Sequence, residues 1–204
     1  MIKKIVLASN NNHKIKEIQE MLKDLPIEVK SLMDEGIEVD IVEDGETFEE
    51  NSKKKATEIA AILRDRGVSD YIVMADDSGL EVDYLNGEPG VHSARYAGEH
   101  GNDSKNNEKL LIELKRVPVE KRGANFVCQL ALIDSNGKYI AIRGEVKGKI
   151  LESLSGIDGF GYDPLFYYEP LGKSFGELSS DEKNKVSHRS VALNEFINKI
   201  KEIL

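Results

Sequence analysis

Hydrophobic and polar positions alternate along the first half of the chain so that strands and helices are predicted in turn. Short apolar runs at residues 2–8 and 71–74 indicate buried strands, and a second short run spans residues 27–32. Between the first two runs, apolar residues recur on one helical face after Ser9–Asn12, which predicts a helix behind a polar loop. A second helix is predicted to begin at Thr47, because Glu50 three residues later completes a capping box, and to end at Gly67.

The second half of the chain predicts a helix, a β-hairpin and a terminal helix. Residues 108–117 carry leucines at helical spacing. Residues 125–133 and 139–146 flank a turn that contains Asn136-Gly137, and both of these residues accept positive φ, so a hairpin is expected. A last helix is predicted to open within residues 183–189. This order of elements predicts an α/β protein with a mixed sheet and flanking helices.

Composition narrows the classes of function. The chain has 204 residues, of which 40% are hydrophobic, enough for the core of a single folding unit. Its formal net charge of −9 argues against a broad nucleic-acid or anionic-membrane interface, although a small phosphorylated ligand needs only a few cations. No signal peptide or long apolar span is present, and the single cysteine, Cys128, excludes an internal disulfide, so we expect a cytoplasmic protein. Cys128 lies in an apolar run and is expected to be a small buried hydrophobe.

Candidate chemistry is concentrated directly after the strand predicted at residues 71–74. Asp76 and Asp77 are expected at the C-terminal end of this strand, where open α/β sheets bind ligands, and two carboxylates there are suited to Mg²⁺. Ser78 and Gly79 would follow in a tight turn close to a ligand. The alternative is an acidic turn that ends a strand and has no further role.

Three other segments carry candidate binding residues. The polar loop before the first helix, with Lys14, fits an anion site, although an Asn-rich N-cap beside a solvated lysine explains the same residues. Glu43 precedes the second helix and is placed to reach a metal ion held by another strand end. Aromatic residues between 160 and 167 either stack on a planar base or pack under a loop. Cations at the start of the last helix oppose its dipole, which indicates a bound anion or a buried acid.

Taken together, six ordered motifs resemble the inosine triphosphate pyrophosphatases, also called non-canonical purine nucleoside triphosphate pyrophosphatases or XTP/dITP diphosphatases. The resemblance extends from about residue 4 to the C-terminus. The motifs are Ser9-Asn10-Asn11 with Lys14, the acidic segment around Glu43, and residues 75–80, 89–96, 160–164 and 187–189. One departure is visible, because the first loop of the family commonly reads Thr-Gly-Asn.

This resemblance implies hydrolysis of ITP, dITP and XTP to the monophosphate and pyrophosphate with Mg²⁺. It also implies one domain over residues 1–204, elongated and two-lobed with the active site in the cleft, that forms homodimers. Asp77 matches the family's general base, and Glu43 and Asp77 match its metal ligands. The substrate-binding positions that the resemblance implies are Ser9, Asn10, Asn11, Asn12, His13, Lys14, Ser78, Phe160, Gly161, Tyr162, Asp163, Lys183, His188 and Arg189.

Two other functions remain as alternatives. A metal-dependent phosphatase of another small phosphorylated substrate would also use aspartates, but the phosphoaspartyl type needs Asp-x-Asp, whereas Asp76 and Asp77 are adjacent. A non-catalytic nucleotide-binding module would keep the loops and have no evident use for the carboxylates.

Overall fold

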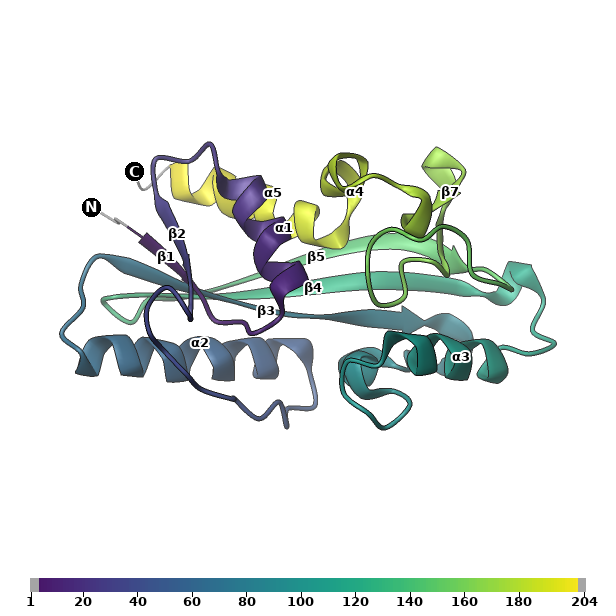
Figure 1. The fold of residues 1–204 in the computed structure, drawn as a ribbon, viewed down its shortest axis with the longest axis horizontal. Coiled ribbons are helices and arrows are strands. Elements are labelled where there is room, and N and C mark those ends of the chain that lie inside the picture. Colours follow the sequence, from purple (N-terminus) through teal and green to yellow (C-terminus); the bar gives the residue numbers. More distant parts are fainter. Residues whose placement is uncertain (1–3, 202–204) are drawn as a thin grey trace. The chain divides into compact units, whose positions relative to one another are not determined.

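The computed structural model describes residues 4–201, which form a mixed sheet with flanking helices (Figure 1). The strand order is β2-β1-β3-β4-β5-β6-β7. β1 (Lys4–Leu7) is parallel to β2 (Glu28–Ser31) and to β3 (Tyr71–Val82). β6 (Phe166–Tyr168) is antiparallel to β5 (Tyr139–Ile150) and to β7 (Lys173–Ser174), and β4 (Gly123–Asp134) lies between β3 and β5. The predicted α/β class is therefore confirmed.

The helices are α1 (Asn12–Leu22), α2 (Phe48–Asp65), α3 (Asp103–Glu113), α4 (Ser180–Val186) and α5 (His188–Lys201). Both predicted N-termini in the first half are confirmed. The side chain of Asn11 accepts hydrogen bonds from the backbone of His13 and Lys14, and Thr47 and Glu50 form the capping box of α2. These caps satisfy backbone N–H groups that have no partner inside a helix.

The chain divides into two compact units. The first contains the residues up to Asp77, residues 128–144 and the residues from Arg189 onward, and the second contains residues 78–127 and 145–188. The boundaries fall within β3, β4, β5 and α5, so each of these elements contributes residues to both units.

In the first unit, strand alternation gives two hydrophobic layers. Ile5 and Leu7 of β1 pack in one cluster with residues of α1 and α5, whereas Val6 packs in another cluster with residues of α2. Figure 1 shows α2 on one side of these strands and α1 and α5 on the other. Successive side chains of a strand point to opposite faces, so a strand with three consecutive apolar residues, as β1 has at residues 5–7, must be covered on both.

The second unit has its own core, built around three phenylalanines. The rings of Phe126 and Phe166 are 4.4 Å apart between centroids, and Phe175 lies 4.9 Å from Phe166. Leu80 of β3 and Leu110 of α3 are fully buried in the same cluster. Phe166 therefore serves packing, which was one of the two alternatives for the aromatic segment.

Sequence-based boundaries were correct for some elements and wrong for others. Strands β4 and β5 are neighbours joined by a turn at the expected place, but of Asn136 and Gly137 only Gly137 has a positive φ, of 83°. The Gly137 N–H donates to the Asp134 carbonyl. α3 begins at Asp103 rather than residue 108, because Asn102 caps it through the Lys105 N–H. The predicted terminal helix is two helices, since Ser187 is extended between α4 and α5. Residues 2 and 3 of the first predicted strand lie outside the described residues. Within residues 4–201, no helix has the length and hydrophobicity that crossing a bilayer requires.

Candidate active site

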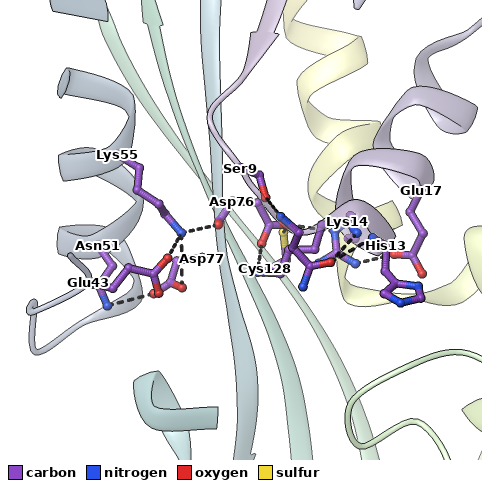
Figure 2. A network of polar contacts seen from close by, with 12 residues as sticks. Ser9, His13, Lys14, Glu17, Glu43, Asn51, Lys55, Asp76, Asp77 and Cys128 are labelled. Carbon is purple, nitrogen blue, oxygen red and sulfur yellow. Dashed lines mark hydrogen bonds and ion pairs between the residues drawn. The ribbon is translucent and has the colours of Figure 1, made fainter. Parts of the chain in front are cut away.

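The two adjacent aspartates lie inside β3, not at its end. The strand continues to Val82, so the expected end of the strand after Met74 and the tight turn at Ser78-Gly79 are wrong. Leu80 and Val82 are buried beyond the polar residues, which keeps the segment extended despite the low strand propensity of Asp and Gly. Because neighbouring side chains in a strand point to opposite faces, the carboxylates of Asp76 and Asp77 cannot both bind the same metal ion. Figure 2 shows them in two separate clusters.

Asp76 binds two cations. Its Oδ1 accepts a hydrogen bond from Lys14 Nζ at 2.8 Å (Figure 2). Its Oδ2 accepts a hydrogen bond from Arg189 Nε at 2.8 Å. The Sγ of Cys128 donates to the same Oδ2 at 3.3 Å. The second cation, Arg189, also pairs with Glu17 of α1. The network thus contains two buried or half-buried carboxylates and two cations, and its formal charges balance.

Electrostatics in this network favour the ionised forms. Burial alone would raise the pKa of Asp76, but the attraction of Arg189 and Lys14 outweighs it and holds that pKa well below its ordinary value. Burial works against the charge on Lys14 as well, yet Asp76 raises the pKa of this lysine overall. The pKa of the Cys128 thiol is raised well above its ordinary value by burial and by Asp76, which favours the neutral thiol. Cys128 is fully buried, as expected from its apolar segment.

Asp77 belongs to a second cluster, which gathers around the ammonium of Lys55. Lys55 Nζ lies 2.6 Å from Glu43 Oε1, 2.7 Å from the carbonyl oxygen of Asp76 and 3.7 Å from Asp77 Oδ1 (Figure 2). Asn51, one turn earlier in α2, donates from Nδ2 to Asp77 Oδ2 at 3.1 Å. Two carboxylates face one ammonium here, which leaves one surplus negative charge.

That surplus is reflected in the acidity of Asp77. Its pKa is raised above the ordinary value, chiefly by burial and further by the charge of Glu43, although Lys55 and Lys14 oppose the shift. A carboxylate with a raised pKa is a better proton acceptor than an exposed aspartate.

Glu43 and Asp77, predicted as metal ligands, thus lie close together, around the ammonium group of Lys55. Among residues 4–201, no group of three or more His, Cys, Asp or Glu side chains is placed to hold a metal ion. Mg²⁺ is usually bound by one or two carboxylates together with substrate phosphates and water. Two carboxylates with a surplus negative charge, already contacting an ammonium, fit that type of site.

The polar loop before α1 agrees in part with the simpler interpretation. Asn11 is the N-cap of α1, Ser9 Oγ accepts a hydrogen bond from the Asn11 N–H at 3.2 Å, and Asn10 donates from Nδ2 to the Val39 carbonyl at 3.0 Å. Asn12 and His13 are exposed in the first turn of α1. Lys14, however, is not solvated, because it is bound to Asp76 at the start of a helix whose dipole favours anions.

A second predicted group lies in the second unit, around Asp163. The carboxylate of Asp163 accepts hydrogen bonds from Lys183 Nζ at 2.6 Å and from the Phe160 N–H at 2.8 Å. Lys183 Nζ also lies 4.5 Å from the centre of the Phe160 ring, and the hydroxyl of Tyr162 donates to the Ser93 carbonyl at 2.9 Å. The segment from Phe160 to Asp163 is therefore a loop held by several polar contacts.

The remaining predicted site residues, His188, Ser78 and Arg189, are buried or half-buried. His188 is buried, with its ring stacked 4.8 Å from that of Phe126. Ser78 is half-buried within β3. Arg189 lies in the first turn of α5 and is bound by carboxylates, so the buried-acid explanation of a cation at this position is confirmed.

Sequence reasoning missed three residues that complete the clusters: Asn51 and Lys55 of α2 and Glu17 of α1. A signal for the first two was present. The buried face of α2 is polar at Asn51, Ser52 and Lys55 before it becomes apolar from Ala56 onward. Lysine is seldom buried unless it is paired, so a lysine on that face indicates a buried carboxylate nearby.

Comparison with known proteins identifies the family to which the chain belongs. A profile described as the Ham1 family matches residues 5–199. A dITP/XTP pyrophosphatase from Clostridium perfringens (strain 13 / Type A) is 59% identical over 203 residues, which are 100% of each chain. The Staphylococcus aureus Ham1 protein has a structure that superposes with a TM-score of 0.86 at 39% identity, covering 99% of this chain and 100% of its own. A HAM1 protein from Coxiella burnetii gives 0.85 at 37% identity, covering 98% and 100%. The chain therefore belongs to the Ham1 family.

Proposed function

We propose that the protein hydrolyses non-canonical purine nucleoside triphosphates, dITP, XTP and ITP, to the monophosphate and pyrophosphate. The observation that carries the proposal is the 59% identity, over the full length of both chains, to a protein named dITP/XTP pyrophosphatase. The cluster of Glu43, Lys55 and Asp77 supports it, because cleaving a phosphoanhydride requires cations for the phosphates and a base for water.

Asp77 is the proposed general base. Its raised pKa suits the removal of a proton from water, and the Asn51 amide fixes the orientation of the carboxylate. Glu43 and Asp77 are the proposed ligands of Mg²⁺, which when bound neutralises charge on the phosphates. Lys14 is proposed to contact the triphosphate, with Asp76 holding the lysine in place. Asp76 thus has a supporting role, outside the metal site.

Base recognition is proposed for the second unit. Phe160 presents an aromatic ring that can stack on a purine, and the Lys183 ammonium lies over this ring, where it is bound to Asp163. ATP carries a 6-amino group in place of the 6-oxo group, so donors aimed at that oxygen would be left unpaired. The resemblance also assigns nucleotide contacts to Ser9–His13, Ser78, Gly161–Asp163, His188 and Arg189, and we adopt these assignments as part of the proposal. We further propose that the enzyme is cytoplasmic and works as a homodimer.

The test is a panel of nucleoside triphosphates assayed with Mg²⁺, with products resolved by chromatography. We expect monophosphate and pyrophosphate from dITP and XTP, and little turnover of ATP. Orthophosphate in place of pyrophosphate would instead identify a phosphatase. The Asp77→Asn variant should be folded and inactive, and binding of nucleotide without turnover by the wild-type protein would identify a binding module.

A further inference from the structure

The backbone of Gly161, in the loop from Phe160 to Asp163, is hydrogen-bonded to α3. Gly161 has a φ of 62°, in the left-handed region, and an added Cβ would meet no atom within 4 Å. The conformation at this position is therefore not imposed by steric crowding. Glycine is also the residue with the largest conformational freedom, so other contacts must hold it.

Two side chains of α3 supply those contacts. The Gly161 N–H donates to Asp103 Oδ2 at 2.6 Å, and Asn107 Nδ2 donates to the Gly161 carbonyl at 2.8 Å. Asp103 and Asn107 are four residues apart, so they lie on the same face of α3. The direction of an N–H group reports φ and that of a C=O group reports ψ. Binding both groups therefore fixes both backbone dihedrals of Gly161.

Burying the side chain of Asn107 has an energetic cost, and the hydrogen bond to Gly161 is the reason for having asparagine at this position. The side chain is buried, with 6% of its surface exposed, and its Oδ1 has no hydrogen-bond partner among residues 4–201. An apolar residue at this site of α3 would avoid a buried acceptor of this kind. The amide donor to Gly161 is what an apolar residue would lose.

From these contacts we infer that Asp103 and Asn107 are positioning residues for base recognition, acting through the Gly161 backbone on the Phe160 ring. The inference rests on the proposed function, in which that ring meets the purine. Asn107 has the larger effect, because its hydrogen bond is sheltered, whereas Asp103 is exposed to water. Neither residue touches the nucleotide in this proposal.

The test compares four variants by steady-state kinetics with dITP and Mg²⁺. We expect Asn107→Leu to raise KM about tenfold, as for one sheltered hydrogen bond, with kcat changed by less than about threefold. Asp103→Ala should raise KM by a smaller factor, and Asp103→Asn should restore nearly wild-type KM, since its amide oxygen still accepts from Gly161. The control is Asn102→Ala, which removes the N-cap of α3 without touching Gly161 and should lower Tm but leave KM unchanged.

A ligand without a base separates positioning from general damage. Inorganic triphosphate should inhibit wild type and Asn107→Leu with the same constant, because only the purine contact is affected. If its inhibition constant rises together with KM, or if Asn102→Ala raises KM as much as Asn107→Leu does, the inference is overturned. Should Asn107→Leu not fold, Asp103→Ala against Asp103→Asn gives the same decision. Absence of dITP turnover by the wild-type enzyme would instead overturn the proposed function.

Discussion

Asp76→Asn should lower the stability of the fold, whereas Asp77→Asn should not. Asp76 and Glu17 balance Lys14 and Arg189, so Asp76→Asn leaves one surplus positive charge in a buried network. Breaking a buried ion pair in this way costs about 3–5 kcal/mol. At about 2–4 °C per kcal/mol for a chain of this size, Tm should fall by about 6–20 °C.

Asp77→Asn should have no such cost. Asp77 and Glu43 together exceed the charge of Lys55 by one, so the substitution leaves a balanced pair of Glu43 and Lys55. The pKa of Asp77 is raised, chiefly by burial, which means that the folded state disfavours its charged form. Removing that charge should therefore not destabilise the fold. The amide oxygen of the introduced asparagine can still accept from Asn51. We expect stability equal to or above that of wild type, together with loss of turnover.

The assay is urea unfolding of the three proteins at neutral pH, followed by circular dichroism, with pyrophosphate release measured in parallel. If Asp76→Asn does not fold, Glu17→Gln serves as a milder test of the same network and should be destabilising too. The charge-balance argument fails if Asp77→Asn loses as much stability as Asp76→Asn does, or if both variants match wild type.

Three further predictions concern the lysines and pH. Lys14→Ala should lower kcat/KM for dITP by roughly 10- to 1,000-fold, and unchanged kinetics would leave Lys14 with only a structural role. In the absence of nucleotide, the Lys55→Met variant should bind Mn²⁺ at least roughly tenfold more tightly than wild type, measured by electron paramagnetic resonance. The reason is that the Lys55 ammonium competes with the metal ion for the carboxylates, and a charge pair at ~4 Å contributes about 4 kcal/mol at an intermediate dielectric constant. Equal affinity would argue against this competition. The pKa of Asp76 is lowered on folding, so its stabilisation is complete above ~3.9, the ordinary aspartate pKa, and is lost as pH falls through the lowered value. The stability gap between wild type and Asp76→Asn should therefore narrow below about pH 4, and a constant gap would contradict the linkage.

Local signals in the sequence were sufficient for several elements. The capping box at Thr47 and the Asn136-Gly137 turn each depend on residues within a few positions of one another, and both lie where they were predicted. The β3 boundary was wrong because its polar residues favour a turn locally, whereas the strand continues to buried Leu80 and Val82.

Much of the site depends on contacts between distant residues. Arg189 meets Asp76 across 113 positions, and Lys14 meets it across 62. The sequence indicated that these cations needed an anion but could not identify which one. Lys55 was missed although it interrupts the apolar face of α2, because that pattern shows only that a partner exists.

Strand alternation at Asp76-Asp77 also limits which insertions the gene could accept. Ala8 donates its N–H to the Met74 carbonyl, and Leu7 pairs with Met74, so the register of β1 against β3 is defined just before the aspartates. One extra residue between Met74 and Asp76 would turn the first carboxylate toward α2 and the second toward α1 and α5, exchanging their partners. An extra residue in the turn after Asp134 would leave both faces unchanged. Insertions and deletions among related chains should therefore occur at such turns and be absent from the middle of β3.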